Sequence, residues 1–302
     1  MPETPEVIGF LADRFPKVSD VVQLHGGEWS RAFAFRSEDR ELVGRFGQHR
    51  EDYEKDRIAA DWVKPGLPIP AFVEIGDAFG GVYAVSQRLH GGKIHDLAID
   101  RRQAVVPKLF DVLTAIHEIE LPGAGFGMWD APRCDAPHSS WPDYLVSIGD
   151  RGEDRLRHWR QRLAEHPNAR TVFDRGLRAL GQLAPSCPNI RRVVHNDLLL
   201  NVLVSTDNEV SAVFDWGNSL AGDPLYDVAM LYATAHVHAR IDPAQIMHVA
   251  RDRFDEPDFD ARVACYELHI ALDAMQYCAY AGLSGELDAT MRRIDALLDR
   301  LA

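Results

Sequence analysis

The sequence predicts an α+β protein with two lobes, a small N-terminal lobe built on a β-sheet and a larger, mainly helical C-terminal lobe. Short apolar runs separated by turn residues dominate the first ninety residues, whereas apolar residues at helical spacing dominate the remainder. The character changes near Arg88–Gly92. A length of 302 residues also allows two domains. We therefore expect lobes over residues 1–90 and 91–302.

In the N-terminal lobe we expect several strands and one helix. The helix covers Glu51–Val63 and ends before Pro65-Gly66, and the glycines of His25-Gly26-Gly27-Glu28 predict a tight turn between two strands. Strands are expected at Asp20–Leu24, Arg31–Phe35, Glu41–Phe46 and Gly81–Gln87.

The C-terminal lobe is expected to consist largely of helices. One of them begins at Asp223-Pro224, because an aspartate suits the N-cap and a proline suits the first helical position. The helical segments are Arg101–Ile119, the segment leading into Val228–Tyr232, Ala261–Tyr280 and Leu287–Leu301.

Composition excludes several classes of protein. With 46 acidic and 33 basic side chains the formal charge is −13, which disfavours binding to nucleic acid. No run is long and apolar enough for a membrane span, and the amino terminus does not resemble a secretory signal. Four cysteines without a CxxC pair argue against a disulfide framework or a zinc finger. We expect a reduced, cytoplasmic enzyme.

The residues that carry chemistry lie around a predicted hairpin. Two apolar runs, Val202–Val204 and Val210–Phe214, are separated by a turn-rich segment. Asp197 and Asn201 precede the first strand and Asp215 follows the second. Because hairpin strands are antiparallel, these three side chains converge at one end. Converging oxygen ligands suit Mg²⁺, and a further carboxylate can accept a proton from a hydroxyl group. The pattern therefore predicts phosphoryl transfer.

The same residues resemble the motifs of the aminoglycoside phosphotransferases, which are relatives of the protein kinases. The similarity is closest to the hygromycin B phosphotransferase branch and extends over nearly the whole chain. The motifs are His195-Asn196-Asp197…Asn201, Asp215-Trp216 and Gly222-Asp223-Pro224…Asp227, with weaker similarity at Val18-Ser19-Asp20, Ser30-Arg31-Ala32-Phe33, Lys55-Asp56-Arg57, Leu67-Pro68-Ile69-Pro70 and Leu272-Asp273.

This resemblance implies a protein-kinase-like fold that binds ATP or GTP between its lobes. Backbone N–H groups near the glycine-rich turn would cover the phosphates, and a basic residue on the third strand, Arg45, would bind them. Its partner on the helix would be Asp56, with Glu54 as a rival. The residues implied for the nucleotide are Gly26, Gly27, Ser30, Arg45, Asp56 and, by their position at the hinge, Ser86, Gln87 and Leu89.

By the same resemblance Asp197 is the catalytic base, and Asn201 and Asp215 bind Mg²⁺. The family has four residues between the base and the metal-binding asparagine, whereas this chain has three. Three explanations stay open: a tightened loop, a metal bound by Asn196 or water in place of Asn201, or a weakened or inactive site. His195 is expected to bond backbone near the loop, and Asp227 to brace the loop.

The acceptor implied by the resemblance is a polycationic aminoglycoside, which would connect the protein with antibiotic resistance. Acidic side chains of the helical lobe, Asp143, Glu267 and Asp273, are the candidates for binding its ammonium groups. We expect a monomer that binds a nucleotide and a cationic small molecule. Alternative hypotheses are a kinase of another small alcohol, such as a sugar, a choline-like amine or a macrolide, and a catalytically impaired pseudokinase. The sequence leaves open the nucleotide preference, the acceptor hydroxyl and the oligomeric state.

Overall fold

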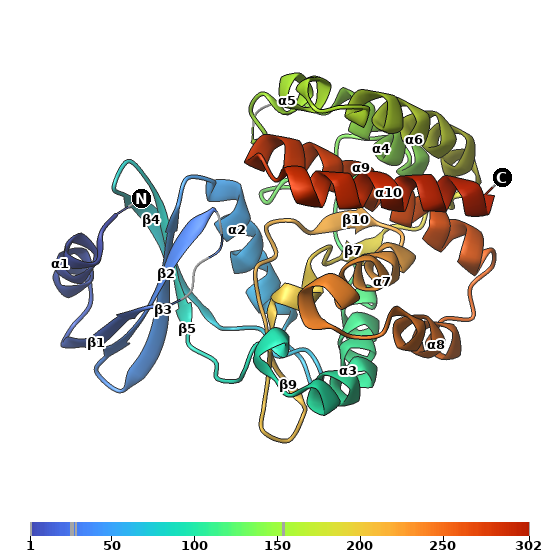
Figure 1. Cartoon of the computed structure of the whole chain (residues 1–302). Coiled ribbons are helices and arrows are strands. Elements are labelled where there is room, and N and C mark those ends of the chain that lie inside the picture. Colours follow the sequence, from blue (N-terminus) through green and yellow to red (C-terminus); the bar gives the residue numbers. More distant parts are fainter. Residues whose placement is uncertain (1, 25–26, 28, 153–154, 302) are drawn as a thin grey trace. The chain divides into compact units, whose positions relative to one another are not determined.

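A computed structural model describes residues 2–24, 27, 29–152 and 155–301, and these residues form two compact units (Figure 1). The first unit lies within residues 1–119, 130–134 and 197–219, and the second within 120–129, 135–196 and 220–302. The predicted hairpin belongs to the first unit. Val204 of the hairpin and Gly92 exchange two backbone hydrogen bonds of 2.9 Å, which connect the hairpin to the rest of this unit. The predicted lobe boundary at residue 90 stays a prediction, since the compact units do not follow chain order.

The first unit is built on a five-stranded antiparallel sheet with the order β1-β2-β3-β5-β4. Its strands are β1 (Val18–Gln23), β2 (Ser30–Ser37), β3 (Arg40–Gly47), β4 (Phe72–Ala78) and β5 (Gly81–Gln87). The four predicted strands are confirmed within one or two residues at most ends. Strand β4 was not predicted. It lies at the edge of the sheet, where its side chains are mostly half-buried, so its apolar residues show little alternation.

Two helices cover the two faces of this sheet (Figure 1). Helix α1 (Thr4–Arg14) packs Val7 and Leu11 against Phe33 and other aromatic residues of the strands. Helix α2 (Arg50–Ala59), extended by a 3₁₀ turn over Ala60–Trp62, packs Tyr53 on the other face. The predicted helix at Glu51–Val63 is thus confirmed, whereas α1 was not predicted. A Pro at its start and a capping box between Glu3 and Glu6 were signals for it.

The rest of the first unit supports the hairpin. The hairpin consists of β8 (Val202–Val204) and β9 (Val210–Val213). Helix α3 (Ile99–His117) packs beside β9, and Arg101 at its start donates to the carbonyl of Ser205 in the hairpin turn at 2.6 Å. Both the helix and the hairpin were predicted, and the hairpin strands agree with the prediction within one residue.

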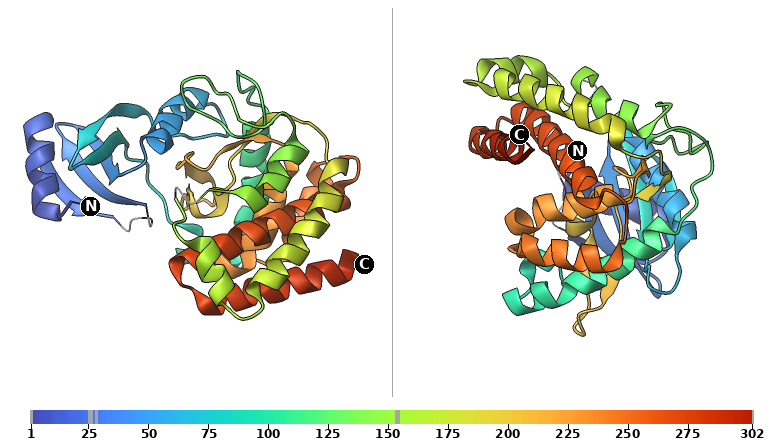
Figure 2. Two further views of the ribbon diagram at one scale, coloured as in Figure 1. Left: turned by 90° about the horizontal axis from the view of Figure 1, so that it is seen from above. Right: turned by 90° about the vertical axis from the view of Figure 1, so that its right-hand side faces the viewer.

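The second unit is mainly helical, as predicted for the C-terminal part. Helix α9 lies at its centre, with α5, α6, α7 and α10 packed against it, and Figure 2 shows α9 and α10 side by side. The helices are α4 (Trp141–Val146), α5 (Trp159–Glu165), α6 (Ala169–Leu183), α7 (Leu225–Ala239), α8 (Pro243–Arg253), α9 (Phe259–Ala281) and α10 (Ser284–Leu301). In the part of the chain that the structure describes, no helix is long and apolar enough to cross a membrane.

A small sheet that was not predicted also belongs to the second unit. Strands β6 (Gly127–Met128), β10 (Leu220–Gly222) and β7 (Arg192–Val194) are antiparallel, with β10 in the middle. At only two or three residues each, these strands are too short to produce a recognisable pattern in the sequence. Strand β7 leads directly to His195.

The start of α7 is held by a buried ion pair. Asp223, predicted as an N-cap, accepts a 3.0 Å hydrogen bond from the backbone N–H of Leu225. The same carboxylate also pairs with the guanidinium of Arg262 at 2.7 Å and accepts a hydrogen bond from the Tyr266 hydroxyl group. Both partners come from α9, so Asp223 joins that helix to the start of α7. The N-cap itself is Pro224, one residue later than predicted.

Aromatic side chains fill the core of the second unit between α4, α7 and α9. Trp141 is fully buried and packs edge-on against Tyr226 and Tyr266. Gly222 makes this possible, because a Cβ atom there would lie 2.2 Å from the Trp141 ring. His269 belongs to the same cluster, and its Nδ1 lies 2.8 Å from the Tyr226 hydroxyl group. Trp141 is therefore a core residue.

Burial of His269 predicts a specific loss of stability in mild acid. Desolvation lowers the pKa of His269 to about 4, compared with about 6.5 in an unfolded chain. Between these values the unfolded state binds more protons, so the free energy of unfolding falls as the pH decreases from 6.5 to 4, by up to about 3 kcal/mol. We expect His269→Gln to flatten the dependence of unfolding free energy on pH across this range, measured by urea denaturation.

The matched control for this measurement is His248→Gln. The His248 side chain is 77% exposed and its contact with Asp252 is also exposed, so its replacement should change the pH dependence of stability far less than His269→Gln does. An unaltered slope in His269→Gln would show that other groups cause the acid sensitivity.

Candidate active site

The hairpin of the first unit brings Asn201 and Asp215 to one end, as predicted. Val202, the first residue of β8, pairs with Val213, the last residue of β9. The residue before β8 and the residues after β9 therefore lie at the same, open end of the hairpin. The backbone N–H of Phe214 donates to the carbonyl of Asn201 at 3.0 Å and extends this pairing by one step. Asn201 and Asp215 are therefore held at adjoining positions by the hydrogen bonds of the strands themselves.

A single 3₁₀ turn over Leu198–Leu200 closes the short segment between Asp197 and Asn201. The N–H of Asn201 donates to the carbonyl of Leu198 at 3.0 Å, and its side-chain amide donates to the Asp197 carboxylate and to the Asp197 carbonyl, both at 2.9 Å. The spacing of three residues is thus accommodated by a tightened loop. With Nδ2 bonded to Asp197, Oδ1 is the side-chain atom of Asn201 that can bind a metal ion.

Asp197 carries an unusually basic carboxylate. Burial raises its pKa to about 7, and the negative charge of Asp215 raises it further, while the Asn201 amide and the Lys93 ammonium group act in the opposite direction. A carboxylate with a pKa near neutrality can both accept and release a proton, as a general base must. The effect of Asp215 also shows that negative charge accumulates here, which favours binding of a cation.

Arg45 lies beside these carboxylates on strand β3. Its guanidinium pairs with Asp56 on α2, is 3.8 Å from the carboxylate of Asp215, and lies 5.0 Å from the centre of the Tyr53 ring. Burial by itself would lower the pKa of Arg45, but the charges of Asp56 and Asp215 raise it above its usual value, so the group stays charged. The structure thus selects Asp56, and not Glu54, as the helix partner of Arg45.

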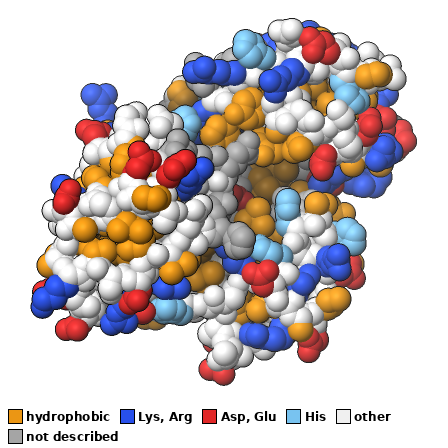
Figure 3. Space-filling view, turned by 60° about the vertical axis from the view of Figure 1, so that its left-hand side comes forward, with side chains coloured by type: hydrophobic (Ala, Val, Ile, Leu, Met, Phe, Trp, Pro, Cys, Tyr) orange, Lys and Arg blue, Asp and Glu red, His pale blue; other side chains and the backbone are white. Residues whose placement is uncertain are grey.

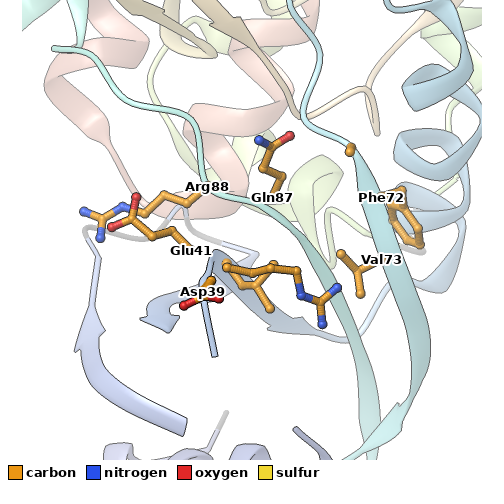
Figure 4. A pocket seen from close by; sticks show the side chains of 9 residues that line it. Asp39, Glu41, Phe72, Val73, Gln87 and Arg88 are labelled. Carbon is orange, nitrogen blue, oxygen red and sulfur yellow. The ribbon is translucent and has the colours of Figure 1, made fainter. Parts of the chain in front are cut away.

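The hinge residues predicted to meet a nucleotide lie on two faces of the sheet. Ser86 stands opposite Val43 on β3, and Ala84 stands opposite Arg45, so Ser86 is on the same face as Arg45. Gln87 points to the other face, where it lines an open hollow of about 650 Å³ with Glu41 and neighbouring side chains (Figure 4). This hollow contains none of Asp197, Asn201 and Asp215, so we do not assign it to the candidate active site. Leu89 follows β5 and is half-buried.

The glycine-rich turn is described only in part. Gly26 lies outside the described residues, and a Cβ atom at Gly27 would meet no other atom within 4 Å. Ser30 begins β2 and pairs with Gly47 at the end of β3. The roles of Gly26, Gly27 and Ser30 in covering phosphates stay predictions.

Comparison with known proteins places the chain in a family. Residues 20–267 match the model of the phosphotransferase enzyme family. The chain belongs to this family. It is 29% identical over 295 residues to hygromycin-B 4-O-kinase of Escherichia coli, a match that covers 96% of this chain and 83% of that relative.

Solved structures agree with this membership. A crystal structure of aminoglycoside phosphotransferase APH(4)-Ia superposes with a TM-score of 0.87 at 27% identity, covering 99% of this chain and 100% of that one. A thermostable mutant of that protein, solved with AMP-PNP and hygromycin B, gives 0.85 at 28% identity, with 98% and 99% coverage. A putative fructosamine-3-kinase from Haemophilus somnus shares the fold, with a TM-score of 0.64 at 16% identity over 97% of both chains. The predicted kinase-like α+β fold and the predicted family are both confirmed.

In this phosphotransferase Asp227 braces the residues that precede Asp197. Its carboxylate, at the start of α7, accepts hydrogen bonds from the backbone N–H groups of His195 at 3.0 Å and Asn196 at 2.8 Å. The side chains of His195 and Asp227 are almost completely buried. The predicted bracing role of Asp227 is confirmed.

The three acids predicted to bind ammonium groups have different environments. Glu267 is 4% exposed and accepts hydrogen bonds from Arg293 at 2.8 Å and Arg300 at 3.0 Å. The expectation that Glu267 binds substrate needs correction, because burial and two arginines make it a structural link between α9 and α10. Asp273 pairs with Arg151, and both side chains are partly exposed.

Asp143 is the most accessible of the three. It lies in the first turn of α4, where its carboxylate accepts a 2.6 Å hydrogen bond from the Ser139 hydroxyl group, and hydrogen bonds from Ser139 and Ser140 lower its pKa. Acidic and basic side chains are interspersed over the face drawn in Figure 3. The net charge of the chain therefore does not by itself locate an acceptor site.

Lys55 belongs to one of the weaker family motifs, but the sequence predicts no role for its side chain. This side chain of α2 is only 1% exposed, and its ammonium group donates to the carbonyls of Gly217 at 3.1 Å and Ser219 at 3.0 Å. The sequence around Lys55 is rich in charged residues, as in a solvent-exposed helix, and does not indicate that Lys55 is buried. Only the tertiary contact with the loop after Asp215 shows it.

The raised pKa of Asp197 predicts that this carboxylate destabilises the metal-free protein. An unfolded aspartate loses its proton near pH 3.9, whereas Asp197 in the folded protein keeps it until about pH 7. The free energy of unfolding therefore decreases as the pH rises between these two values. We expect Asp197→Asn to raise the free energy of unfolding by about 1–3 kcal/mol at pH 8 without divalent ions, and by little at pH 4. Thermal denaturation at both pH values measures this.

Asp207→Asn provides the matched control. Asp207 lies exposed in the turn of the same hairpin, so its replacement should not change stability at either pH. Equal melting temperatures for the wild type and Asp197→Asn at pH 8 would contradict the raised pKa.

Proposed function

We propose that this chain is an O-phosphotransferase that transfers the γ-phosphate of a nucleoside triphosphate to a hydroxyl group of an aminoglycoside, with hygromycin B as the acceptor. The observation that carries the proposal is the convergence of Asp197, Asn201 and Asp215 beside Arg45. The relative in Escherichia coli is a hygromycin-B kinase, and structures of APH(4)-Ia contain AMP-PNP or ADP together with hygromycin B. Both support the choice of nucleotide and acceptor.

Asp197 is the proposed base. The acceptor oxygen attacks the γ-phosphorus, the bond from that phosphorus to the β–γ bridging oxygen breaks, and the nucleoside diphosphate leaves. The hydroxyl proton passes to the Asp197 carboxylate, whose pKa of about 7 suits this transfer. No covalent enzyme intermediate is needed, because positioning and electrostatic stabilisation supply most of the catalysis.

The proposed nucleotide site uses the sheet and its turn. Arg45 is held by Asp56 and offers a guanidinium to the α- and β-phosphates. Backbone N–H groups near Gly26, Gly27 and Ser30 would cover the phosphates, and the backbone of Ser86, Gln87 and Leu89 would meet the adenine edge. Whether ATP or GTP is preferred depends on this hinge.

The donor set at the end of the hairpin fits Mg²⁺. Asp215 contributes a carboxylate and Asn201 an amide oxygen, and hard oxygen ligands of this kind are typical of magnesium sites completed by phosphate oxygens and water. Among the residues that the structure describes, no group of three or more His, Cys, Asp or Glu side chains is arranged to hold a metal ion, so phosphate and water ligands are needed. When bound, Mg²⁺ would neutralise charge that develops on the phosphates.

For the acceptor we propose Asp143 and Asp273 as contacts for ammonium groups. Asp143 is exposed, and the Asp273 carboxylate is partly exposed even though Arg151 pairs with it. We further propose that the protein acts as a monomer in the cytoplasm and contributes to antibiotic resistance.

A direct assay tests the proposal. Purified protein is incubated with ATP or GTP, Mg²⁺ and each of hygromycin B, other aminoglycosides, a macrolide, choline and simple sugars, and phosphorylated products are identified by mass spectrometry. We expect phosphorylated hygromycin B. Transfer only to a different alcohol would replace the acceptor, and nucleotide binding without transfer to any alcohol would identify a pseudokinase.

Asp197→Asn is the diagnostic variant for the proposed base. We expect its kcat to fall at least about a hundredfold, because the group that accepts the hydroxyl proton is lost, while nucleotide binding stays nearly unchanged. Full activity in this variant would remove Asp197 from the mechanism.

A second pair of variants decides which asparagine binds the metal. We expect Asn201→Ala to raise the Mg²⁺ concentration for half-maximal activity about tenfold to a hundredfold. Asn196→Gly should change it little, because glycine tolerates the positive φ of 65° at this position and keeps the backbone bond to Asp227. A larger effect of Asn196→Gly than of Asn201→Ala would reverse the assignment.

A further inference from the structure

The loop that follows β9 is seated on helix α2 by several independent contacts within the first unit. Residues 215–219 form this loop, which we call the metal loop because Asp215 begins it. Polar contacts, an aromatic contact and one close backbone approach hold it against the helix. None of these contacts involves the Asp215 side chain itself.

Lys55 supplies the polar contact with the far part of the metal loop. Its ammonium group is buried and donates to the carbonyls of Gly217 and Ser219, at 3.1 and 3.0 Å. A buried ammonium group is unfavourable unless its donors find acceptors, and two converging carbonyls provide them. The pairing works in both directions, because these buried carbonyls also need a donor. The loop backbone and the lysine thus fix each other.

Asp56, the next residue of α2, holds the near part of the metal loop. Its Oδ1 atom accepts a 2.8 Å hydrogen bond from the backbone N–H of Trp216. The Trp216 ring is buried and meets Trp62, just beyond α2, edge-on at 5.3 Å. Lys55 and Asp56 therefore bind three of the five residues of the loop.

Gly217 allows the loop to approach α2 closely. A Cβ atom at this position would lie 2.8 Å from the Cβ atom of Asp52, closer than real Cβ contacts. The loop backbone is therefore in direct contact with the helix and has no room for a side chain here. The close approach to Asp52 and the hydrogen bond from Lys55 thus hold the same residue, Gly217, against α2.

Asp215 begins the metal loop in a left-handed backbone conformation. Its φ of 63° lies in a region that residues other than glycine adopt at a cost in free energy, although aspartate does so more readily than most. Such a conformation persists only where the surroundings determine it. The contacts of α2 with Trp216, Gly217 and Ser219, three of the following four residues, supply that constraint.

From these contacts we propose that Lys55 is a positioning residue, which holds the metal loop so that the Asp215 carboxylate faces Asn201. The inference rests on the proposed function for its catalytic consequence, although the effect on the loop does not. Lys55 touches neither substrate nor metal in this scheme. It acts through the backbone of Gly217 and Ser219.

Lys55→Met removes the donors at nearly constant side-chain volume. In the metal-free protein we expect backbone amides of the metal loop to exchange with deuterium at least about tenfold faster, because two of its anchoring hydrogen bonds are lost. With Mg²⁺ and ATP we expect kcat to fall about tenfold to a hundredfold and the Mg²⁺ requirement to rise, as misplacement of a ligand by about 1 Å would produce. The KM for hygromycin B should stay within about threefold.

Lys64→Met is the matched control. Lys64 also belongs to the first unit, but its ammonium group forms a partly exposed ion pair with Glu118 at 2.9 Å. Its replacement should leave amide exchange of the metal loop and kcat unchanged. Lys55→Gln keeps a hydrogen-bond donor on a shorter side chain, so kcat and amide exchange should lie between those of the wild type and Lys55→Met. This variant also allows the test if Lys55→Met does not fold.

The two readouts separate this inference from the proposed function. Faster exchange of the metal loop in Lys55→Met, with transfer absent even in the wild type, would support the positioning of the loop and overturn the proposed function. Wild-type exchange and wild-type kcat in a folded Lys55→Met protein, shown by its near-ultraviolet circular dichroism, would overturn the inference about Lys55.

Discussion

The carboxylate of Asp56 is the interaction on which the candidate active site depends, because it joins three elements of the first unit. Asp56 belongs to α2, pairs with Arg45 of β3 through one oxygen and accepts the Trp216 N–H through the other. Removal of this buried carboxylate would take the hydrogen-bond acceptor from the Trp216 amide and leave the Arg45 guanidinium with the longer, 3.8 Å contact to Asp215. Strand, helix and loop are thus coupled. The guanidinium and the Asp215 carboxylate occupy defined positions because one side chain constrains both.

A second constraint is the accumulation of negative charge around the hairpin end. Asp197 is largely buried near Asp215, and this raises its pKa to about 7. Such an arrangement lowers the stability of the metal-free protein, since burial and the charge of Asp215 make ionisation of Asp197 less favourable. The Asn201 amide offsets only part of this effect. In a site that binds a cation, close carboxylates favour binding of that cation, whereas in a structural core they would only reduce stability. Perturbed pKa values are therefore common at functional sites.

Local features of the fold and site could be predicted from sequence, whereas partners distant in sequence could not. The hairpin, and the convergence of Asn201 and Asp215, follow from apolar runs and a turn that are close together in the chain. The family resemblance added Arg45 and its acidic partner. Helix α1 was missed although its capping residues signalled it, and β4 was missed because an edge strand alternates weakly.

Buried charged side chains with partners distant in sequence account for two further differences between the prediction and the structure. Glu267 was expected to face a substrate, but its partners Arg293 and Arg300 lie 26 and 33 residues further along the chain. Burial of Lys55 depends on carbonyls 162 and 164 residues away. No local pattern encodes such pairs, because a charged residue on a helix has the same sequence neighbours whether it faces solvent or another element.

The three-residue spacing between Asp197 and Asn201 is accommodated by a tightened loop. Here the turn closes with a 3.0 Å backbone hydrogen bond, and the Asn201 amide reaches Asp197 at 2.9 Å. The nitrogen of this amide is bonded to Asp197, so the amide oxygen is the atom that could bind a metal ion. The three-residue spacing thus keeps Asn201 in contact with Asp197, in agreement with the roles proposed for the two residues as metal ligand and base.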